Sequence, residues 1–396
     1  MLSSGRMAET ALPVDRTFGG AVTRSAFWRR LRPRPWMIVA AIPIALVAAE
    51  ATVRMRDAAR GYAPNARSAW YWLFEQDPFL GYRGRPNAST WFLPPGQPLL
   101  GDRIQHNADG FRDARSFADL RRTVDRKLIV CVGDADTYGL TAGGADRTYP
   151  AALEKELRRL SGDAGWIVFN AGMPGYTSHE ILELVKLKLL KLRPDAIVSM
   201  SLRNDYEQVT LYLDDDADYD SYPLRMAALS RDGVTDLFMR SALVGRLAQR
   251  WRQRVPDDLG GRHPRIAYGE ATARGLKLYL DNVALTAELC RRSGVSLLQV
   301  DQPIHYSACS YGDAQIRSVE GMRRDLRRLA SESGFGVLDA HAGFDWEGIE
   351  AHGDLLLGSN ESLMGAAGYA RLAQVLAPQI LEAYARRTPE GQAAAH

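Results

Sequence analysis

Residues 128–139 read Leu-Ile-Val-Cys-Val-Gly-Asp-Ala-Asp-Thr-Tyr-Gly. The first five form an unbroken apolar run, which is typical of a strand buried on both faces of a parallel sheet. Gly133 and Gly139 bracket a short polar segment, which predicts a tight turn where that strand ends. The layout is that of a turn that presents a nucleophile, but Ala135 at its centre carries only a methyl group. The stretch therefore predicts a fold and, in the same place, the loss of the group that usually reacts there.

Downstream of this stretch, short apolar runs alternate with longer helical patterns. The candidate strands are 128–133, 166–171, 195–201, 295–300 and 336–340. The candidate helices are 149–161, 178–192, 264–293, 313–333 and 365–386. This alternation predicts a three-layer α/β/α sandwich with a central parallel sheet. The charged residues 206–262 interrupt the rhythm, and we expect them to be an insertion on the carboxyl side of the sheet.

The composition excludes several other classes of protein. The 396 residues are 46% hydrophobic and 24% charged with a net charge of +3, as in an ordinary globular protein. The basic residues are not interleaved with aromatic ones, so we expect no nucleic-acid partner. Cys131 and Cys290 lie in apolar patterns and are predicted core residues, whereas Cys309 lies in a polar loop. No Cys/His spacing suits a metal, and we expect neither a metal nor a cofactor.

The amino-terminal region has the charge pattern of a membrane anchor. Seven arginines and no lysine precede an apolar run at 36–49; they are Arg6, Arg16, Arg24, Arg29, Arg30, Arg32 and Arg34. We interpret 36–56 as a single-pass anchor in the cytoplasmic membrane, with the carboxyl-terminal domain periplasmic or otherwise outside the cytoplasm. A cleaved signal peptide is a second interpretation, because Ala49-Glu50-Ala51 is a small-x-small site. A buried core helix is a third.

The remaining segments flank this anchor and the α/β pattern. Residues 1–35 are basic and predicted to be disordered, as is the tail 387–396. Residues 57–127 are rich in Pro, Gly and aromatic residues, and we expect an irregular lead-in with short strands and turns at Asn87 and Asp109-Gly110. The α/β domain itself is predicted to cover residues 128–386.

Three predicted strand ends carry polar motifs, and in open α/β sheets sites form beyond the carboxyl ends of the strands. The motifs are Gly133-Asp134-Ala135, Asn170-Ala171-Gly172-Met173-Pro174-Gly175 and Ser201-Leu202-Arg203-Asn204. The order of these motifs resembles that in the SGNH/GDSL hydrolases, specifically their membrane-anchored bacterial branch. Three surrounding segments add to the resemblance: Gly81-Tyr82-Arg83, Asn107 to Asp113 and Arg193-Pro194-Asp195.

The resemblance implies a site for ester hydrolysis from which the reacting groups are missing. In the family a serine attacks an ester, a glycine N–H and an asparagine side chain stabilise the oxyanion, and a late Asp-x-x-His supplies the base. Carried over by motif, Ala135 replaces the serine, Asp134 organises the turn, and Gly172 and Asn204 match the oxyanion donors. Anchored on Gly368-Tyr369, the late motif has Asn360 for the aspartate and Leu363 for the histidine.

Three functions remain open on these residues. The first is a pseudoenzyme that has lost esterase activity and binds a glycan or an envelope protein partner, in exopolysaccharide or cell-envelope assembly. The second is an active esterase, acyltransferase or deacetylase for exported carbohydrate that uses relocated residues, for which His305, His341 and His352 are histidines to consider. The third is a structural scaffold of a membrane complex.

Overall fold

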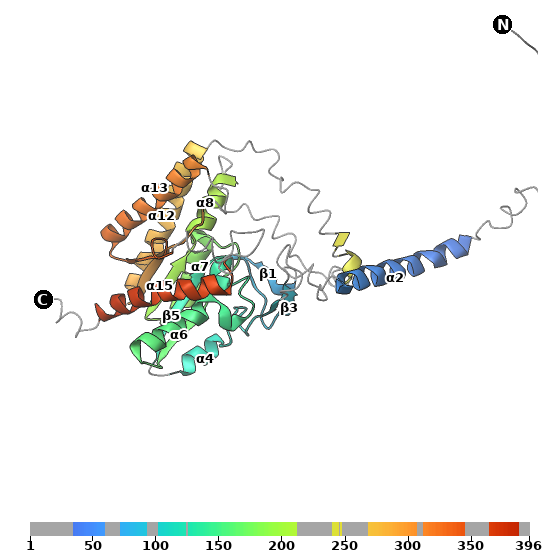
Figure 1. Ribbon diagram of the computed structural model, residues 1–396, viewed down its shortest axis with the longest axis horizontal. Helices are drawn as coiled ribbons and strands as arrows, with labels where there is room; N and C mark the ends of the chain where they lie inside the picture. The colour runs from blue at the N-terminus through green and yellow to red at the C-terminus, as the bar shows by residue number, and fades with distance from the viewer. Residues whose placement is uncertain are drawn as a thin grey trace, which may run out of the picture. The chain divides into compact units, whose positions relative to one another are not determined.

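The structure is a computed structural model, and it describes residues 35–59, 72–92, 102–123, 126–211, 240–244, 246–247, 268–306, 312–344 and 364–387. Two compact units divide the chain, residues Met1–Ala51 and Thr52–His396. Figure 1 shows the elements of both units along the chain. The predicted insertion at 206–262 lies almost wholly outside the described residues, as do the predicted disordered ends and Cys309.

A five-stranded parallel sheet forms the centre of the second unit, in the order β6-β5-β7-β8-β9. Its strands lie within about one residue of the predicted ones; they are β5 (Lys127–Gly133), β6 (Trp166–Asn170), β7 (Ala196–Met200), β8 (Ser296–Asp301) and β9 (Gly336–Asp339). In the register, Cys131 pairs with Asn170 on one side and Val198 on the other. The reversal of strand order beside β5 is the point where such sheets place their sites.

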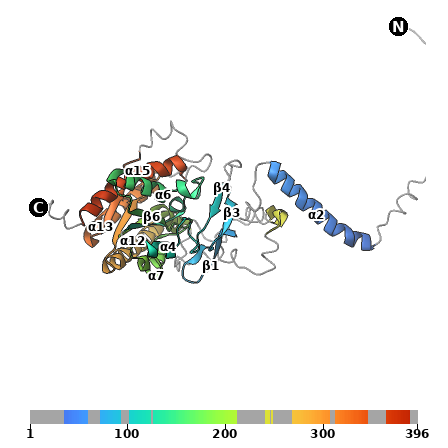
Figure 2. The same ribbon diagram turned by 90° about the horizontal axis from the view of Figure 1, so that it is seen from below.

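Helices cover both faces of the sheet, so the predicted sandwich is confirmed (Figure 2). One face carries α6 (Tyr149–Ser161) and α15 (Ala366–Ala385), and the other carries α7 (Ser178–Leu187), α12 (Tyr268–Arg292) and α13 (Asp313–Ser333). Successive β5 side chains alternate between the two cores: Val130 packs with the α7 and α12 side, and Cys131 with the α6 and α15 side. Shorter helical segments are α8 (Leu202–Leu211), η2 (Ala145–Arg147) and η3 (Leu189–Leu192).

The lead-in is part of the same hydrophobic core. It contains two antiparallel hairpins, β1 (Phe74–Asp77) with β2 (Gly81–Gly84) and β3 (Ser89–Phe92) with β4 (Asp102–Gln105), followed by the short helix α4 (Phe117–Arg122). Both predicted turns occur, because Asn87 and Gly110 have left-handed φ angles of 55° and 88°. Buried apolar residues of the lead-in pack in one cluster with those of the sheet, so it is not an irregular appendage.

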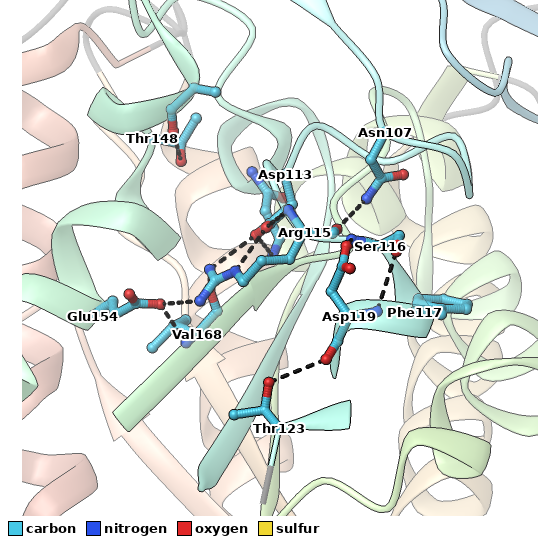
Figure 3. A network of polar contacts seen from close by, with 12 residues as sticks. Asn107, Asp113, Arg115, Ser116, Phe117, Asp119, Thr123, Thr148, Glu154 and Val168 are labelled. Carbon is cyan, nitrogen blue, oxygen red and sulfur yellow. Dashed lines mark hydrogen bonds and ion pairs between the residues drawn. The ribbon is translucent and has the colours of Figure 1, made fainter. Parts of the chain in front are cut away.

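Side chains satisfy the outer edge of β6, the end strand of the sheet (Figure 3). The N–H of Val168 donates to Glu154 at 2.8 Å, and its carbonyl accepts from the Arg115 guanidinium at 2.9 Å. The N–H of Asn170 donates to Asp113 at 3.0 Å, and Arg115 bridges Asp113 and Glu154. An unpaired strand edge invites pairing with another chain, and here the lead-in and α6 occupy those groups.

The helix α2 (Pro35–Ala59) contains the predicted anchor 36–56 and extends it by one residue at the amino end and three at the carboxyl end. At about 1.5 Å per residue, its 25 residues exceed the roughly 30 Å hydrocarbon core of a bilayer. Only 6% of its most apolar window is buried, and Trp36, Val39 and Val47 are each more than 60% exposed. Length and composition therefore permit α2 to span a membrane.

Candidate functional site

The first motif forms the predicted turn at the carboxyl end of β5. Asp134 caps the single helical turn α5 (Ala135–Tyr138) by accepting the N–H of Asp136 at 3.0 Å, and whether it also contacts a ligand stays a prediction. The turn closes on Gly139 in the left-handed conformation, with φ of 73°. Ala135, the first residue of α5, is half-buried. The frame that would present a nucleophile is therefore complete, and a methyl group stands where an oxygen would react.

The second motif places Gly172 against the α5 turn. Its N–H donates to the side chain of Asn170 at 3.0 Å, a partner within its own loop. A Cβ at this position would lie 2.3 Å from the N of Tyr138 and 2.6 Å from the carbonyl carbon of Thr137. Gly172 therefore lets the second loop approach the α5 turn, and its role as an oxyanion donor stays a prediction.

The third motif places Asn204 against the second loop. Its Nδ2 donates to the carbonyl oxygen of Tyr176 at 2.9 Å, and the side chain is half-buried. Tyr82 of the lead-in braces the same loop, because its hydroxyl donates to the carbonyl of Pro174 while the Tyr176 hydroxyl donates to the Tyr82 carbonyl at 2.5 Å. Asn204 therefore joins two motif loops, and whether it also contacts a ligand stays a prediction.

Two buried carboxylates meet beneath the Ala135 turn. Gln302, which follows β8, donates its side-chain nitrogen to Asp134 at 3.0 Å and to Asp136 at 3.3 Å. All three side chains are less than 4% exposed. Burial, and then repulsion by Asp136, raise the pKa of Asp134 to about 7. The sequence analysis missed Gln302, since a lone glutamine after a strand carries no pattern.

The acid pair makes a specific prediction about the pH dependence of stability. A carboxyl whose pKa is higher in the folded than in the unfolded state stabilises the fold at low pH, and this stabilisation is lost as pH rises from about 4 to about 7. We expect Asp136→Asn to remove the like-charge neighbour and to reduce that loss by about 1 kcal/mol. Urea unfolding at pH 5 and pH 8 measures this loss of unfolding free energy, and the substitution of an exposed aspartate, Asp146→Asn, is the control. An equal loss between pH 5 and pH 8 in the wild type and in Asp136→Asn contradicts the prediction.

The lead-in holds the other end of the α5 turn. The Nε2 of His106 lies 2.7 Å from the Tyr138 hydroxyl, and burial lowers the pKa of His106 to about 4, so the ring is neutral at pH 7. The buried guanidinium of Arg112 donates to the carbonyl of Gly139 and lies 5.5 Å from the centre of the Tyr138 ring. These residues lie in or beside the Asn107 to Asp113 segment that sequence analysis singled out without assigning it a role.

The late motif is only partly described. Asn360, Leu363 and His352 lie outside the described residues, whereas Tyr369 lies buried in α15 with its hydroxyl 3.1 Å from that of Thr141. His305 and His341 follow β8 and β9, at the same edge of the sheet as the motifs. Among the described residues, no group of three or more His, Cys, Asp or Glu side chains is placed to hold a metal.

A surface groove of about 290 Å³ lies elsewhere, between α6 and α15. Its floor is made of small residues such as Ala152 and Ala370, and charged side chains such as Arg147 and Glu156 line it. None of the predicted site residues lines this groove, so it is separate from the motif loops.

Comparisons with known proteins give the following. No family model matches the chain, and no curated protein matches it. Solved structures do match, and each of the three that follow covers 64% of this chain. A lipolytic protein of the G-D-S-L family from Desulfitobacterium hafniense is 14% identical, with 99% of its own chain covered and a TM-score of 0.39, and a lipase/acylhydrolase from Enterococcus faecalis is 13% identical, with 95% covered and a TM-score of 0.39. A catalytic mutant of an acetylxylan esterase from Geobacillus stearothermophilus is 15% identical, with 94% covered and a TM-score of 0.41. The described α/β domain has the strand order β6-β5-β7-β8-β9 with three motif loops at the carboxyl edge of that sheet, and it is a three-layer α/β/α sandwich.

Proposed function

We propose that this protein is a catalytically silent member of the SGNH fold that is anchored in the cytoplasmic membrane. Its cleft would bind a glycan or a protein partner in envelope or exopolysaccharide assembly. The observation that carries the proposal is Ala135 at the start of a fully formed α5 turn. A methyl group can neither attack an ester nor exchange a proton, so no acyl-enzyme can form at this position.

The polar frame around Ala135 supports retention of a ligand. The bond from Asn204 to Tyr176 joins the third motif loop to the second, and the bond between Gly172 and Asn170 holds the second loop itself. The Asn204 carboxamide is half-buried at the edge of this frame and has a second N–H and an oxygen that can meet a sugar hydroxyl or an acyl carbonyl. Each such hydrogen bond contributes about 1 kcal/mol net.

The Asn204→Ala variant tests this proposal. We expect it to weaken glycan binding at least tenfold while costing only about 1 kcal/mol of stability, the usual net worth of one hydrogen bond. The probe is an array of O-acetylated and deacetylated oligosaccharides, and the melting temperature is measured in parallel. Gln379→Ala is the matched control, because Gln379 is a half-buried carboxamide of α15 that bonds to the backbone of Asp339 at 2.8 and 3.1 Å. A large loss of stability in Asn204→Ala with unchanged binding would make the cleft a scaffold.

The membrane part of the proposal rests on α2 and on the charge around it. The seven arginines before residue 36 favour a cytoplasmic amino terminus, since positive flanks stay on the cytoplasmic side. We expect a periplasm-dependent reporter fused after His396 to be active. We also expect Arg→Glu changes at Arg29, Arg30, Arg32 and Arg34 to reduce the correctly oriented fraction. A fusion that is active only in the cytoplasm contradicts the orientation.

A relocated catalytic group is the second candidate, and one cluster favours it. The Tyr306 hydroxyl donates to Glu320, and the Nε2 of His341 lies 3.9 Å from the same carboxylate oxygen. Burial lowers the pKa of His341 to about 4, so its imidazole is neutral and can accept a proton from water. If this cluster activates water, the wild type hydrolyses acetyl esters and His341→Ala abolishes the hydrolysis. If the wild type does not hydrolyse acetyl esters, or if His341→Ala still does, this cluster is excluded as a catalytic site.

A further inference from the structure

The Gln302 side chain connects parts of the cleft that come from different strands. Its Nε2 faces Asp134 and Asp136 of the loop after β5, at 3.0 and 3.3 Å. Its Oε1 accepts the backbone N–H of Arg203, at the start of α8, at 3.0 Å. We propose that Gln302 is a positioning residue of the cleft, whose buried carboxamide sets the spacing between Ala135 and Asn204.

The backbone of Gln302 is itself fixed by a buried ion pair. Its carbonyl accepts from the Arg323 guanidinium at 2.8 Å, and the same guanidinium pairs with Asp301, the last residue of β8. Arg323 and Asp301 are each at most 1% exposed. Gln302 therefore projects from an anchored point, and its side chain transmits that position to the two motif loops.

A carboxamide provides both a donor and an acceptor in this geometry at any pH between 5 and 8, whereas a carboxylic acid does so only while it is protonated. The two aspartates need a donor between them, while the Arg203 N–H needs an acceptor, and a neutral amide offers both without adding charge. A leucine or methionine of similar size would leave three buried polar groups without this partner, which costs stability. A charged glutamate would place a third carboxylate beside two others.

The charges around the aspartates give this role a pH signature. Arg203 of α8 lowers the pKa of Asp134, whereas Asp136 raises it. Tyr149 of α6 and Tyr369 of α15 also face the pair, and both stay protonated because burial raises their pKa values. The Asp134 carboxyl, and that of any glutamate placed at 302, are then the groups that we expect to change charge here between pH 5 and pH 8.

Hydrogen exchange of the full chain in detergent micelles tests the inference without a ligand. In Gln302→Glu at pH 5 the protonated acid keeps an acceptor and an O–H donor, so protection of peptide 201–206 should equal that of the wild type. At pH 8 we expect that protection to fall at least tenfold. Gln302→Met should lose it at both pH values. Gln299→Glu is the matched control, because Gln299 is as buried as Gln302 and lies on β8, where its side chain donates to the Tyr279 hydroxyl at 3.5 Å.

Two results at pH 8 would overturn the inference. One is equal protection of peptide 201–206 in the wild type and in Gln302→Glu, and the other is an equal loss of that protection in Gln302→Glu and in Gln299→Glu. If Gln302→Glu does not fold at pH 8, the pH 5 comparison decides: equal protection in Gln302→Glu and Gln302→Met overturns it. The inference rests on the proposed function only in calling the region a ligand cleft. Absence of a ligand leaves the positioning role intact, and unchanged exchange leaves the binding proposal intact.

Discussion

Arg323→Met is expected to lower the free energy of unfolding by about 3 kcal/mol, the lower end of the range for removing one partner of a buried ion pair. The substitution leaves the Asp301 carboxylate, which is fully buried, without its buried cation. Arg327 stays 2.6 Å from the other oxygen of Asp301, but it is 45% exposed and compensates only in part. Chemical unfolding at pH 7 measures the change.

The matched control lies on the same helix. Arg328 of α13 is 67% exposed and pairs with Asp325 at 2.9 Å, so Arg328→Met should cost no more than about 0.5 kcal/mol. Similar losses for both substitutions would show that the buried pair beneath Gln302 contributes no more than a surface contact.

Gly172→Ala is expected to destabilise the protein by more than about 2 kcal/mol, because the new Cβ overlaps backbone atoms of Thr137 and Tyr138 that cannot turn aside. Either the second loop or the α5 turn must shift, so exchange protection should fall in both. Gly321→Ala in α13 is the control: its Cβ meets only the end of the Arg324 side chain at 3.9 Å, and it should stabilise the helix by roughly 0.5–1 kcal/mol. A neutral Gly172→Ala would show that the close approach of these two loops does not depend on this glycine.

The fold could be predicted from the sequence because its signals are local. Apolar runs of strand length alternate with helical patterns, and the predicted helices at 149–161 and 313–333 have the same bounds as α6 and α13. The position of Ala135 followed from the same reasoning, since a buried strand followed by Gly133 and Gly139 fixes the turn. The composition of the lead-in predicted its turns at Asn87 and Gly110 as well.

The site was harder to predict because its contacts join residues far apart in the chain. Gln302 lies 168 residues from Asp134, and Tyr82 lies 92 from Pro174. Neither contact leaves a periodic trace in the sequence. The bond from the Gly172 N–H to Asn170 was not predicted for a related reason, because it depends on the folded loop and not on the motif. The membrane orientation, the ligand and the late motif positions Asn360 and Leu363 stay predictions.

Reaction with a serine-directed fluorophosphonate, together with hydrolysis of p-nitrophenyl acetate, tests the central claim of catalytic silence most directly. We expect that the fluorophosphonate does not label the wild-type full chain. We also expect the wild type to hydrolyse the ester no faster than the Asn204→Ala variant does. Ala135→Ser alone is expected to gain little turnover, because a catalytic unit that lacks its base is strongly non-additive. Wild-type hydrolysis well above that of Asn204→Ala would contradict the account. So would efficient turnover by Ala135→Ser alone, which would reveal a base that the silent site should not possess.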